Sequence, residues 1–505
     1  MTQPLICMCL TGKTLEEDFQ LVKKYEKYVD VVELRVDHLS EEEQLYVKRF
    51  PSMIYKPCIL TIRRTDDGGL FSGSEFSRTN LFARALAFAE PDKSKNFAFV
   101  DFEEDYHVPS MHDATMAFGV RIIRSCHSMN APVHNIRQRC DEMRKTAGEI
   151  PKIAFMPDSL ADVETLFRET QDFTDYDHII CAMGAEGLPS RILAGCTNSF
   201  LTYTSPQETL GKMNGIGHID PISLRDLYGF KSISESTKIF GITGWPLSKT
   251  SSPEIHNGGY KKLGIDAVYV PLRATSISNA VNFADAVGIQ GMSVTIPHKE
   301  TVIHYLDEQS EEVVRIEACN TIVKSEDGKW VGYNTDVGGF RRALDEFLCG
   351  TKIKFKKVAV IGAGGAAKAI VHALKQMGAR VCIFNRTVEH AQRLAEKYGF
   401  SYCQLDARSA SKIDEYSTLI VQTTSVGMNS DAPSSKENDP LYFYEFRGNE
   451  MVFDIIYTPS VTPIMRRAAA AGCRTCNGYK MLEYQAYEQF ALFTGRDMEQ
   501  TNPDD

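Results

Sequence analysis

The sequence predicts an α/β protein with an amino-terminal (β/α)8 barrel, a smaller α/β unit and a dinucleotide-binding fold. Three observations lead to this prediction. Short apolar runs alternate with amphipathic helical stretches over the first 230 residues, and the alternation restarts after the polar, serine-rich spacer KSISESTK. A later apolar run passes directly into a glycine turn and a helical stretch, VAVIGAGGAAKAIVHAL.

Eight apolar runs in the first 230 residues are expected to be strands. Stretches with helical periodicity, such as TLEEDFQLVKKYEKY and LADVETLFRET, lie between them. Eight such βα units in a segment of this length are typical of a (β/α)8 barrel. The expected strands are residues 5–10, 31–36, 58–63, 97–102, 120–125, 151–156, 178–183 and 199–204.

The remaining residues predict two further units. Strands are expected at 238–244, 267–272 and 292–297, and a strand, glycine turn, helix and second strand follow from residue 356. The tail, PIMRRAAAAGCRTCNG and then YKMLEYQAYEQFALFTG, is expected to be helical and to return to the second unit. The expected domains are residues 1–230 (barrel), 231–237 (linker), 238–338 plus 477–505 (smaller α/β unit) and 339–476 (dinucleotide fold).

Composition excludes several classes of function. The net charge of −10 and the pI of about 5.7 argue against a nucleic-acid or anionic-membrane partner. No apolar stretch approaches the roughly 20 residues needed to span a bilayer. Thirteen scattered cysteines suit a reducing compartment, and Cys473-x-x-Cys476 has no second pair, so no metal site is expected.

The glycine turn predicts a dinucleotide site. Gly362 permits the tight turn, Gly364 lets a pyrophosphate approach the backbone, and Ala367 keeps the helix close to its strand. Where an NAD site would place an acidic residue, the second strand ends in Asn385-Arg386-Thr387. A cation and two donors suit a 2′-phosphate, which favours NADP; alternatively, Arg386 is a solvated surface residue. The expected cofactor contacts at the turn are Gly362, Ala363, Gly364, Gly365 and Ala366.

Two charged residues in the second half are candidates for proton transfer. Lys299 ends VTIPHKE, and Asp336 follows Asn334 and Thr335 in GYNTDVGGF. If they converge in a cleft, they could relay a proton during a hydride transfer. Periodicity alone is also compatible with the alternative that Lys299 and Asp336 are exposed charges on loops.

The barrel has its own candidate, Lys152, in the apolar run IPKIAFMP. Burying an ammonium there is unfavourable unless its pKa drops or it gains partners, and a desolvated amine can become a nucleophile that forms a Schiff base. The alternative is a lysine on the barrel rim that extends to solvent. Barrel enzymes place their chemistry at the carboxyl ends of the strands. The other candidates at this mouth are Glu33, Arg35 and Asp37 on strand two, Arg63 on strand three, His127 after strand five and Arg191 after strand seven.

Residues 238–505 resemble shikimate dehydrogenases across nearly their whole length. The matching segments include GITGWPLSKTSSPEIHN, VTIPHKE, EACNTIV, GYNTDVGGF, GAGGAAKA, NRT, TTSVGM, DIIYTPSVTP and GYKMLEYQA. The resemblance implies reversible reduction of 3-dehydroshikimate by NADPH, with Lys299 and Asp336 as the catalytic pair. Threonine stands at position 250, where the family often has serine, and His390 replaces a second basic residue after NRT. The implied substrate ligands are Thr250, Ser252, Thr295, Asn320, Tyr457 and Gln485, and Asn385, Arg386, Thr387, Thr423 and Gly478 complete the implied cofactor site.

Residues 5–228 resemble type I 3-dehydroquinate dehydratases. The segments LTGKT, VVELRVDH, TIRRTDDGG, RSCHS, IPKIAFMP and SRILAG match in order. The resemblance implies that Lys152 forms an imine with the C3 ketone and that His127 moves the proton while water is eliminated. Asp67 stands where the family usually has a glutamate supporting the histidine, and MNGIGHI, with Asn214 and His218, replaces the SAPGQ-like closing loop. The implied substrate contacts are Glu33, Arg35, Arg63, Met183, Arg191 and Tyr203.

The order of the two modules matches the bifunctional shikimate-pathway enzymes of plants and some bacteria, which serve aromatic amino-acid biosynthesis. We therefore expect a monomeric, NADP(H)-dependent, metal-free enzyme acting on 3-dehydroquinate, 3-dehydroshikimate and shikimate. The start at Met1 without a visible leader suits a bacterial cytoplasm, or a plastid if the chain is a processed plant enzyme. Two alternatives stay open: a catabolic quinate or shikimate dehydrogenase using NAD, and a metabolite-sensing protein without catalysis.

Overall fold

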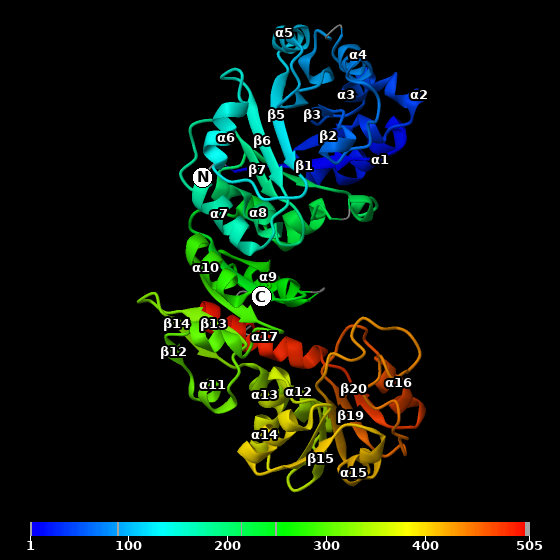
Figure 1. Cartoon of the computed structure of the whole chain (residues 1–505), viewed down its shortest axis with the longest axis vertical. Helices are drawn as coiled ribbons and strands as arrows, with labels where there is room; N and C mark the ends of the chain where they lie inside the picture. The colour runs from blue at the N-terminus through cyan, green and yellow to red at the C-terminus, as the bar shows by residue number, and fades with distance from the viewer. Residues whose placement is uncertain (1–2, 88–89, 214, 248–249, 500–505) are drawn as a thin grey trace. The chain divides into compact units, whose positions relative to one another are not determined.

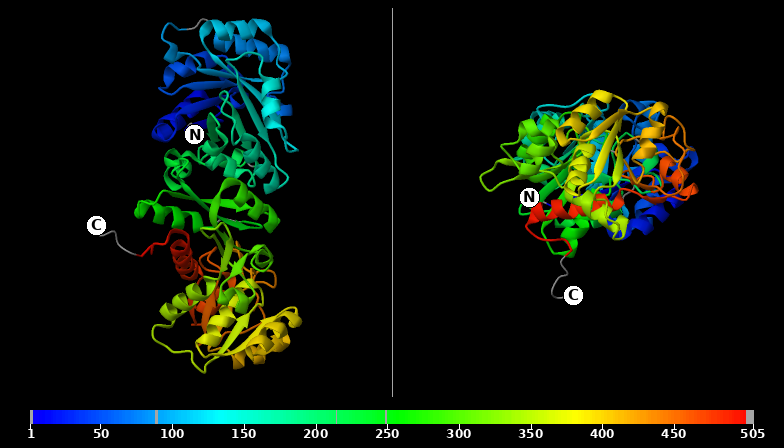
Figure 2. Two further views of the ribbon diagram at one scale, coloured as in Figure 1. Left: turned by 90° about the vertical axis from the view of Figure 1, so that its left-hand side faces the viewer. Right: turned by 90° about the horizontal axis from the view of Figure 1, so that it is seen from below.

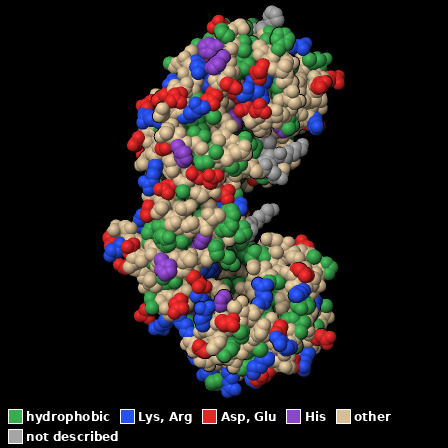
Figure 3. Space-filling model, viewed as in Figure 1, with side chains coloured by type: hydrophobic (Ala, Val, Ile, Leu, Met, Phe, Trp, Pro, Cys, Tyr) green, Lys and Arg blue, Asp and Glu red, His purple; other side chains and the backbone are tan. Residues whose placement is uncertain are grey.

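The computed structural model describes residues 3–499 except 88–89, 214 and 248–249, and at 212–213 only the backbone. The chain divides into two compact units, Met1–Ile289 and Gln290–Asp505 (Figure 1). Each unit is described separately. Asp, Glu, Lys and Arg side chains are interspersed over the face drawn in Figure 3.

The first unit contains an eight-stranded parallel sheet in the order β7-β6-β5-β4-β3-β2-β1-β8. The strands β7 and β8 stand at the two ends of this order, and Phe200 N donates to His178 O (2.7 Å) just before them. The sheet is thus a nearly closed barrel, which confirms the predicted fold. The strands are β1 (Leu5–Leu10), β2 (Val31–Arg35), β3 (Cys58–Thr61), β4 (Phe99–Glu103), β5 (Arg121–Ser128), β6 (Ile150–Phe155), β7 (Ile179–Ala182) and β8 (Leu201–Thr204).

Helices lie outside this ring of strands (Figures 1 and 2). Local sequence explains where they begin: Thr14 accepts a hydrogen bond from Glu17 N at the start of α1, and Ser159 forms a capping box with Asp162 at the start of α7. The helices of this part are α1 (Leu15–Tyr25), α2 (Glu41–Gln44), α3 (Phe50–Met53), α4 (Glu75–Leu86), α5 (Pro109–Phe118), α6 (Ile136–Met143), α7 (Leu160–Thr170) and α8 (Leu188–Ile192).

The barrel interior is apolar in one layer and polar in the next. Alternate residues of each strand face inward, and the register sets Thr61 beside Asp101 and Ser125 beside Lys152. The polar layer therefore gathers side chains from neighbouring strands toward their carboxyl ends. The apolar layer comprises Cys7, Cys9, Val31, Ile59, Phe99, Ile123, Ile150, Ile179, Leu201 and Tyr203.

The first unit continues with the parallel pair β9 (Lys238–Gly244) and β10 (Ala267–Arg273) and with the helices α9 (Ser252–Lys262) and α10 (Ile277–Val287). Helix α10 packs on α7 through the edge-to-face rings of Phe283 and Phe167, whose centroids are 5.4 Å apart. Both rings are buried. The barrel and this α/β segment therefore share an apolar contact inside one unit.

The second unit begins with β11 (Ile289–Val294), β13 (Thr321–Lys324) and β14 (Trp330–Tyr333), which pair antiparallel, and β12 (Glu308–Gln309), which is parallel to β14. Its helices here are α11 (Glu311–Ile316), α12 (Asp336–Leu348) and α17 (Tyr479–Thr494). Helix α17 packs closely on α12 at Gly339, where a Cβ atom would lie 2.8 Å from Gln485 Cβ. The close approach brings Gln485 to the amino-terminal end of α12.

The second unit also holds a six-stranded parallel sheet in the order β17-β16-β15-β18-β19-β20. This order reverses between β15 and β18, as in dinucleotide-binding folds, where ligands bind at the reversal. The strands are β15 (Lys357–Ile361), β16 (Arg380–Asn385), β17 (Ser401–Gln404), β18 (Leu419–Gln422), β19 (Met451–Asp454) and β20 (Arg474–Cys476). The covering helices are α13 (Gly365–Gln376), α14 (Val388–Tyr398), α15 (Ala410–Glu415) and α16 (Pro463–Ala470).

The structure corrects several details of the predicted elements. The tail is not helical throughout, because Arg474–Cys476 pairs with β19 as an edge strand. His127 lies inside β5 rather than after it, whereas Asp37 and Arg63 lie just beyond the ends of β2 and β3. Among the described residues, no helix is long and apolar enough to cross a membrane.

Candidate functional site

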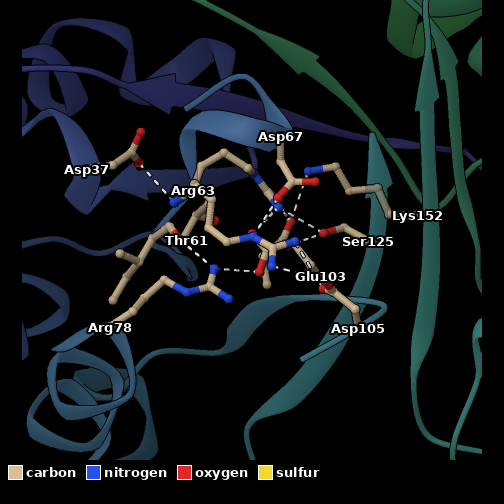
Figure 4. Close-up of polar contacts among 12 residues, drawn as sticks. Asp37, Thr61, Arg63, Asp67, Arg78, Glu103, Asp105, Ser125 and Lys152 are labelled. Carbon is tan, nitrogen blue, oxygen red and sulfur yellow. Dashed lines mark hydrogen bonds and ion pairs between the residues drawn. The ribbon is translucent and has the colours of Figure 1, made fainter. Parts of the chain in front are cut away.

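Lys152 belongs to a buried polar cluster in the barrel, and Figure 4 shows its side chain pointing from its strand into that cluster. Only 4% of its surface is exposed, and Nζ lies 3.0 Å from Asp101 Oδ2 and 3.9 Å from Glu33 Oε1. Nζ also stands 4.4 Å from the centre of the Tyr203 ring. Lys152, a charged residue in an apolar strand, is therefore surrounded by two carboxylates and the face of an aromatic ring.

Asp101, on β4, connects Lys152 to the neighbouring strands. Its carboxylate accepts from Ser125 Oγ (2.5 Å) and pairs with Arg63 Nη2 (2.8 Å). Burial raises the pKa of Asp101, but the charges of Arg63 and Lys152 outweigh burial and hold that pKa well below its usual range. Asp101 is therefore a fixed anion shared by two buried cations.

His127 lies on β5, two residues beyond the level of Lys152. Burial and the charges of Arg63 and Lys152 lower the pKa of His127 well below its usual value, so the imidazole is neutral near pH 7. Its Nδ1 atom has no hydrogen-bond partner among the described residues. A neutral imidazole with a free nitrogen can take up a proton during a reaction.

Other side chains at the mouth present unused donors. On α8, Arg191 is 1% exposed and donates from Nη2 to Ile216 O (2.8 Å), but its Nε and Nη1 atoms have no partner among the described residues. The Tyr203 hydroxyl is also unpaired there, while Met183 belongs to a small apolar cluster. Arg35, by contrast, is held by Asp37 (3.0 and 2.8 Å). Because buried polar atoms normally find partners, the unpaired donors indicate a polar ligand.

A loop after β8 covers part of this mouth. Ile216 packs on the apolar cluster and its carbonyl accepts from Gly184 N (3.1 Å), while Ser205 N donates to Ile219 O (3.1 Å). His218 Nδ1 shares a hydrogen bond with Ser205 Oγ (2.7 Å). Burial and the charges of Arg191, Arg35 and Lys152 lower the pKa of His218 well below its usual value. Asn214 lies outside the described residues.

Asp101 and Glu103 were not predicted as site residues from the sequence. Asp67, which was predicted, binds a different side chain from the one expected. Asp101 lies inside the run FAFVDF, which reads as an apolar strand, and Glu103 follows this run directly as the last residue of β4. Their spacing of two within that strand is a signal that could have revealed an inward-facing acidic pair. Asp67 binds Arg64 Nε (2.8 Å), and among the described residues it has no hydrogen bond to His127.

The second unit brings Lys299 and Asp336 together. Lys299 Nζ donates to Asp336 Oδ2 (2.5 Å), and Asn320 Nδ2 donates to Asp336 Oδ1 (3.0 Å) and to Gln485 Oε1 (2.9 Å). Asp336 is the first residue of α12, where the helix dipole favours a negative charge. Thr295 is half-buried just after β11, and Tyr457 is half-buried after β19. The half-buried lysine and the buried aspartate thus form an ion pair within reach of amide side chains.

Thr250 and Ser252 belong to the first unit. Thr250 Oγ1 donates to Ser252 Oγ (3.1 Å) and accepts from Ser252 N (3.2 Å) at the start of α9. Ser252 is buried and Thr250 half-buried. The two hydroxyl groups therefore lie side by side.

The glycine turn has the geometry of a phosphate-binding loop. Gly362 has φ +112°, and a Cβ atom there would lie 2.5 Å from Thr423 Oγ1, which donates to Ile361 O (2.7 Å). Gly364 is exposed with open space beside it, directly before α13, whose free amides can bind an anion. Ala363, Gly365 and Ala366 surround the same turn. The turn therefore fits a dinucleotide pyrophosphate.

The residues expected to read the ribose lie at the end of β16. Asn385 Nδ2 donates to Thr387 O (2.9 Å), and Arg386 and Thr387 are exposed. Among the described residues, no ion pair or hydrogen bond occupies the Arg386 guanidinium. Gly478 is buried, and a Cβ atom there would lie 1.9 Å from Ile455 O. A free guanidinium beside the turn fits a 2′-phosphate.

Three family models match the chain in succession. They are type I 3-dehydroquinase (residues 6–235), shikimate dehydrogenase substrate binding domain (242–322) and shikimate / quinate 5-dehydrogenase (345–436). A solved shikimate 5-dehydrogenase from Thermus thermophilus, in complex with NADP(H) and shikimate, is 30% identical with a TM-score of 0.44. It covers 53% of this chain, and this chain covers 96% of it.

Among the curated relatives that match this chain at the sequence level are one from Pyrococcus furiosus and one from Arabidopsis thaliana. The NADP(+) shikimate dehydrogenase of Pyrococcus furiosus is 41% identical over 52% of this chain and 93% of its own length. The chloroplastic bifunctional 3-dehydroquinate dehydratase/shikimate dehydrogenase of Arabidopsis thaliana is 31% identical over 97% of this chain and 82% of its own length. With both modules matched in the same order, the chain belongs to the family of bifunctional 3-dehydroquinate dehydratase/shikimate dehydrogenases.

Proposed function

We propose that the chain converts 3-dehydroquinate to 3-dehydroshikimate in the barrel and then reduces 3-dehydroshikimate to shikimate with NADPH. The observation that carries the proposal is the buried Lys152, 3.0 Å from Asp101, in a chain of this family. The proposed domains are residues 1–230 for dehydration, 231–237 as linker, 238–338 plus 477–505 for shikimate binding, and 339–476 for NADP binding.

The barrel residues support an imine mechanism. Lys152 passes its ammonium proton to neutral His127, and the amine attacks the C3 ketone; His127 then returns that proton to the carbinolamine hydroxyl, which leaves as water and gives an iminium. The iminium withdraws electrons from the C2–H bond, and neutral His127 accepts that proton. His127 then returns the proton to the departing hydroxyl, which leaves as water, and hydrolysis of the iminium frees 3-dehydroshikimate and restores the Lys152 ammonium.

Charge at the barrel mouth suits the substrate. Arg191 keeps its Nε and Nη1 atoms for a carboxylate or hydroxyl, and His218 and Tyr203 add groups that form hydrogen bonds. Glu33 accepts from Thr61 Oγ1 (2.9 Å) and can orient the Lys152 amine. The proposed contacts are Glu33, Arg35, Arg63, Met183, Arg191 and Tyr203.

Reduction needs a proton donor for the substrate oxygen and a site for the dinucleotide. Lys299 and Asp336, 2.5 Å apart, hold the proton that the developing alkoxide takes up, and Asn320 orients Asp336. Residues 362–366, Thr423 and Gly478 would hold the pyrophosphate and nicotinamide portions, and Asn385, Arg386 and Thr387 the adenosine 2′-phosphate. When bound, NADPH supplies the hydride. The proposed substrate contacts of this half are Thr250, Ser252, Thr295, Asn320, Tyr457 and Gln485.

Both reactions can be followed separately on the intact chain. Without NADPH, 3-dehydroquinate should accumulate as 3-dehydroshikimate, and adding NADPH should yield shikimate. Lys152→Met should abolish the first step and leave the second, whereas Asp336→Asn should impair the second and leave the first. Borohydride with 3-dehydroquinate should leave a covalent adduct on the wild type only. Dehydration by Lys152→Met, or an adduct on it, would reject the imine mechanism.

A further inference from the structure

A second buried arginine stands behind the barrel site. Arg78, on α4, is completely buried and has no part in the steps described above. Its Nη1 atom donates to Glu103 Oε2 (2.6 Å) and to Ile62 O (3.0 Å), and Nη2 donates to Glu75 Oε2 (3.1 Å). Arg78 thus links helix α4 to the carboxyl end of β4.

Four ion pairs connect Arg78 to the amine of Lys152 (Figure 4). Beyond the Arg78–Glu103 pair, Glu103 Oε1 pairs with Arg63 Nη1 (2.8 Å) and Arg63 Nη2 with Asp101 Oδ2 (2.8 Å). Asp101 Oδ2 then pairs with Lys152 Nζ (3.0 Å). All five side chains are more than nine-tenths buried, so solvent screens these interactions little.

Glu103 divides its two oxygens between two arginines. A carboxylate and a guanidinium prefer to meet through two parallel hydrogen bonds. If Oε2 were free, Glu103 could bind Arg63 in that way, and Arg63 would have to turn from Asp101. Arg78 occupies Oε2, so Arg63 uses one nitrogen for Glu103 and keeps the other for Asp101.

We propose that Arg78 is a positioning residue for dehydration: it holds Glu103 so that Arg63 fixes Asp101 against Lys152. The inference rests on the proposed function of the barrel. Because Arg78 touches no substrate, its loss should disturb the placement of the amine more than the affinity for substrate. A misplacement of about 1 Å at a reacting group can cost on the order of 100-fold in rate.

Arg78→Met tests this proposal. The kcat for dehydration should fall about 10- to 100-fold, and borohydride trapping should slow equally, while KM for 3-dehydroquinate changes less than about 3-fold. Arg78→Lys, which keeps a cation and donors, should recover most of the lost kcat. Oxidation of shikimate by the second half of the same chain should stay at the wild-type rate.

Arg124→Met is the matched control. Arg124 is a buried arginine of β5 that binds the carboxylate of Glu149 (2.7 Å) and the backbone carbonyl of Glu103, but not the Glu103 carboxylate. The Arg124→Met variant should have a lower melting temperature than the wild type, with little change in the kcat for dehydration. Equal loss of kcat in the Arg78 and Arg124 variants, or wild-type kcat in Arg78→Met, would overturn the proposal.

If Arg78→Met fails to fold, Glu103→Gln decides the question. Its amide can accept from only one arginine and turns a donor toward the other, so kcat should again fall with KM nearly unchanged; wild-type kcat would overturn the proposal. A wild-type chain that does not dehydrate 3-dehydroquinate would instead refute the proposed function itself.

Discussion

Asp101→Asn is the substitution whose effect on stability the structure predicts most directly. Asp101 is 1% exposed. Its carboxylate forms ion pairs with Arg63 (2.8 Å) and Lys152 (3.0 Å) and accepts a hydrogen bond from Ser125 Oγ (2.5 Å). An asparagine of the same shape has one oxygen and turns an amide donor toward a cation or a hydroxyl. Removing one partner of a buried ion pair costs about 3–5 kcal/mol, because the remaining charges are left uncompensated.

The assay is differential scanning calorimetry, with NADP⁺ alone added to identify the transition of the second unit, which contains all the proposed cofactor contacts. A loss of 3–5 kcal/mol should lower the transition of the first unit, which spans Met1–Ile289, by about 5–8 °C. Asp105→Asn is the matched control: Asp105 binds both terminal nitrogens of Arg64 at 3.0 Å, but its side chain is 60% exposed. An exposed pair contributes about 0–1 kcal/mol, so this variant should melt near the wild type.

The pH dependence gives a second test. The pKa of Asp101 is lowered in the folded chain, so its contribution to stability is present above the unfolded value of about 3.9. That contribution is lost as the pH falls through the folded pKa. The difference between wild type and Asp101→Asn should therefore be constant from about pH 8 to 5 and shrink only below about pH 4. Equal melting of the Asp101 and Asp105 variants would refute the reasoning.

Four other substitutions test the two sites. Lys299→Met should lower kcat for shikimate oxidation by about 100- to 10,000-fold without changing dehydration, since general acid–base groups contribute this much. Arg386→Ala should raise KM for NADPH about 10-fold but not KM for NADH, because only NADPH has a phosphate for the guanidinium. His218→Leu should raise KM for 3-dehydroquinate about 5-fold, the value of one hydrogen bond, whereas His218→Gln should stay near the wild type. Arg191→Met should raise KM for 3-dehydroquinate about 10- to 100-fold without lowering the melting temperature. Steady-state kinetics of both reactions on each variant, with a melting curve, check all four.

Patterns of hydrophobicity were enough to predict the barrel and the dinucleotide fold. The eight barrel strands lie within a few residues of their predicted ranges, because buried parallel strands read as continuous apolar runs. The turn at Gly362 is also local, since it needs a positive φ and a close backbone approach. Features set by a few neighbouring residues are those that a sequence reveals.

Features set by pairing between distant segments were not predicted. Residues Arg474–Cys476 form a strand only because β19 offers a free edge, and the sequence around them has no strand pattern. Asp101 and Glu103 matter because the register of β3, β4 and β5 turns them toward Arg63 and Lys152. Asp67 reads as a partner for His127, yet Arg64 is its neighbour three residues earlier along the chain.

The balance of charge around Lys152 explains why an apolar strand can contain a lysine. Asp101 and Glu103 offset Arg63 and Arg78, and Glu33 stands near Lys152 itself, so these buried charges nearly cancel. Arg191 differs, because among the described residues it has a carbonyl partner and no carboxylate. A buried guanidinium without a counter-charge is unfavourable in the free protein, and an anionic ligand removes that cost when it binds. The barrel mouth is therefore one negative charge short, and we expect the carboxylate of 3-dehydroquinate to supply it when the substrate binds.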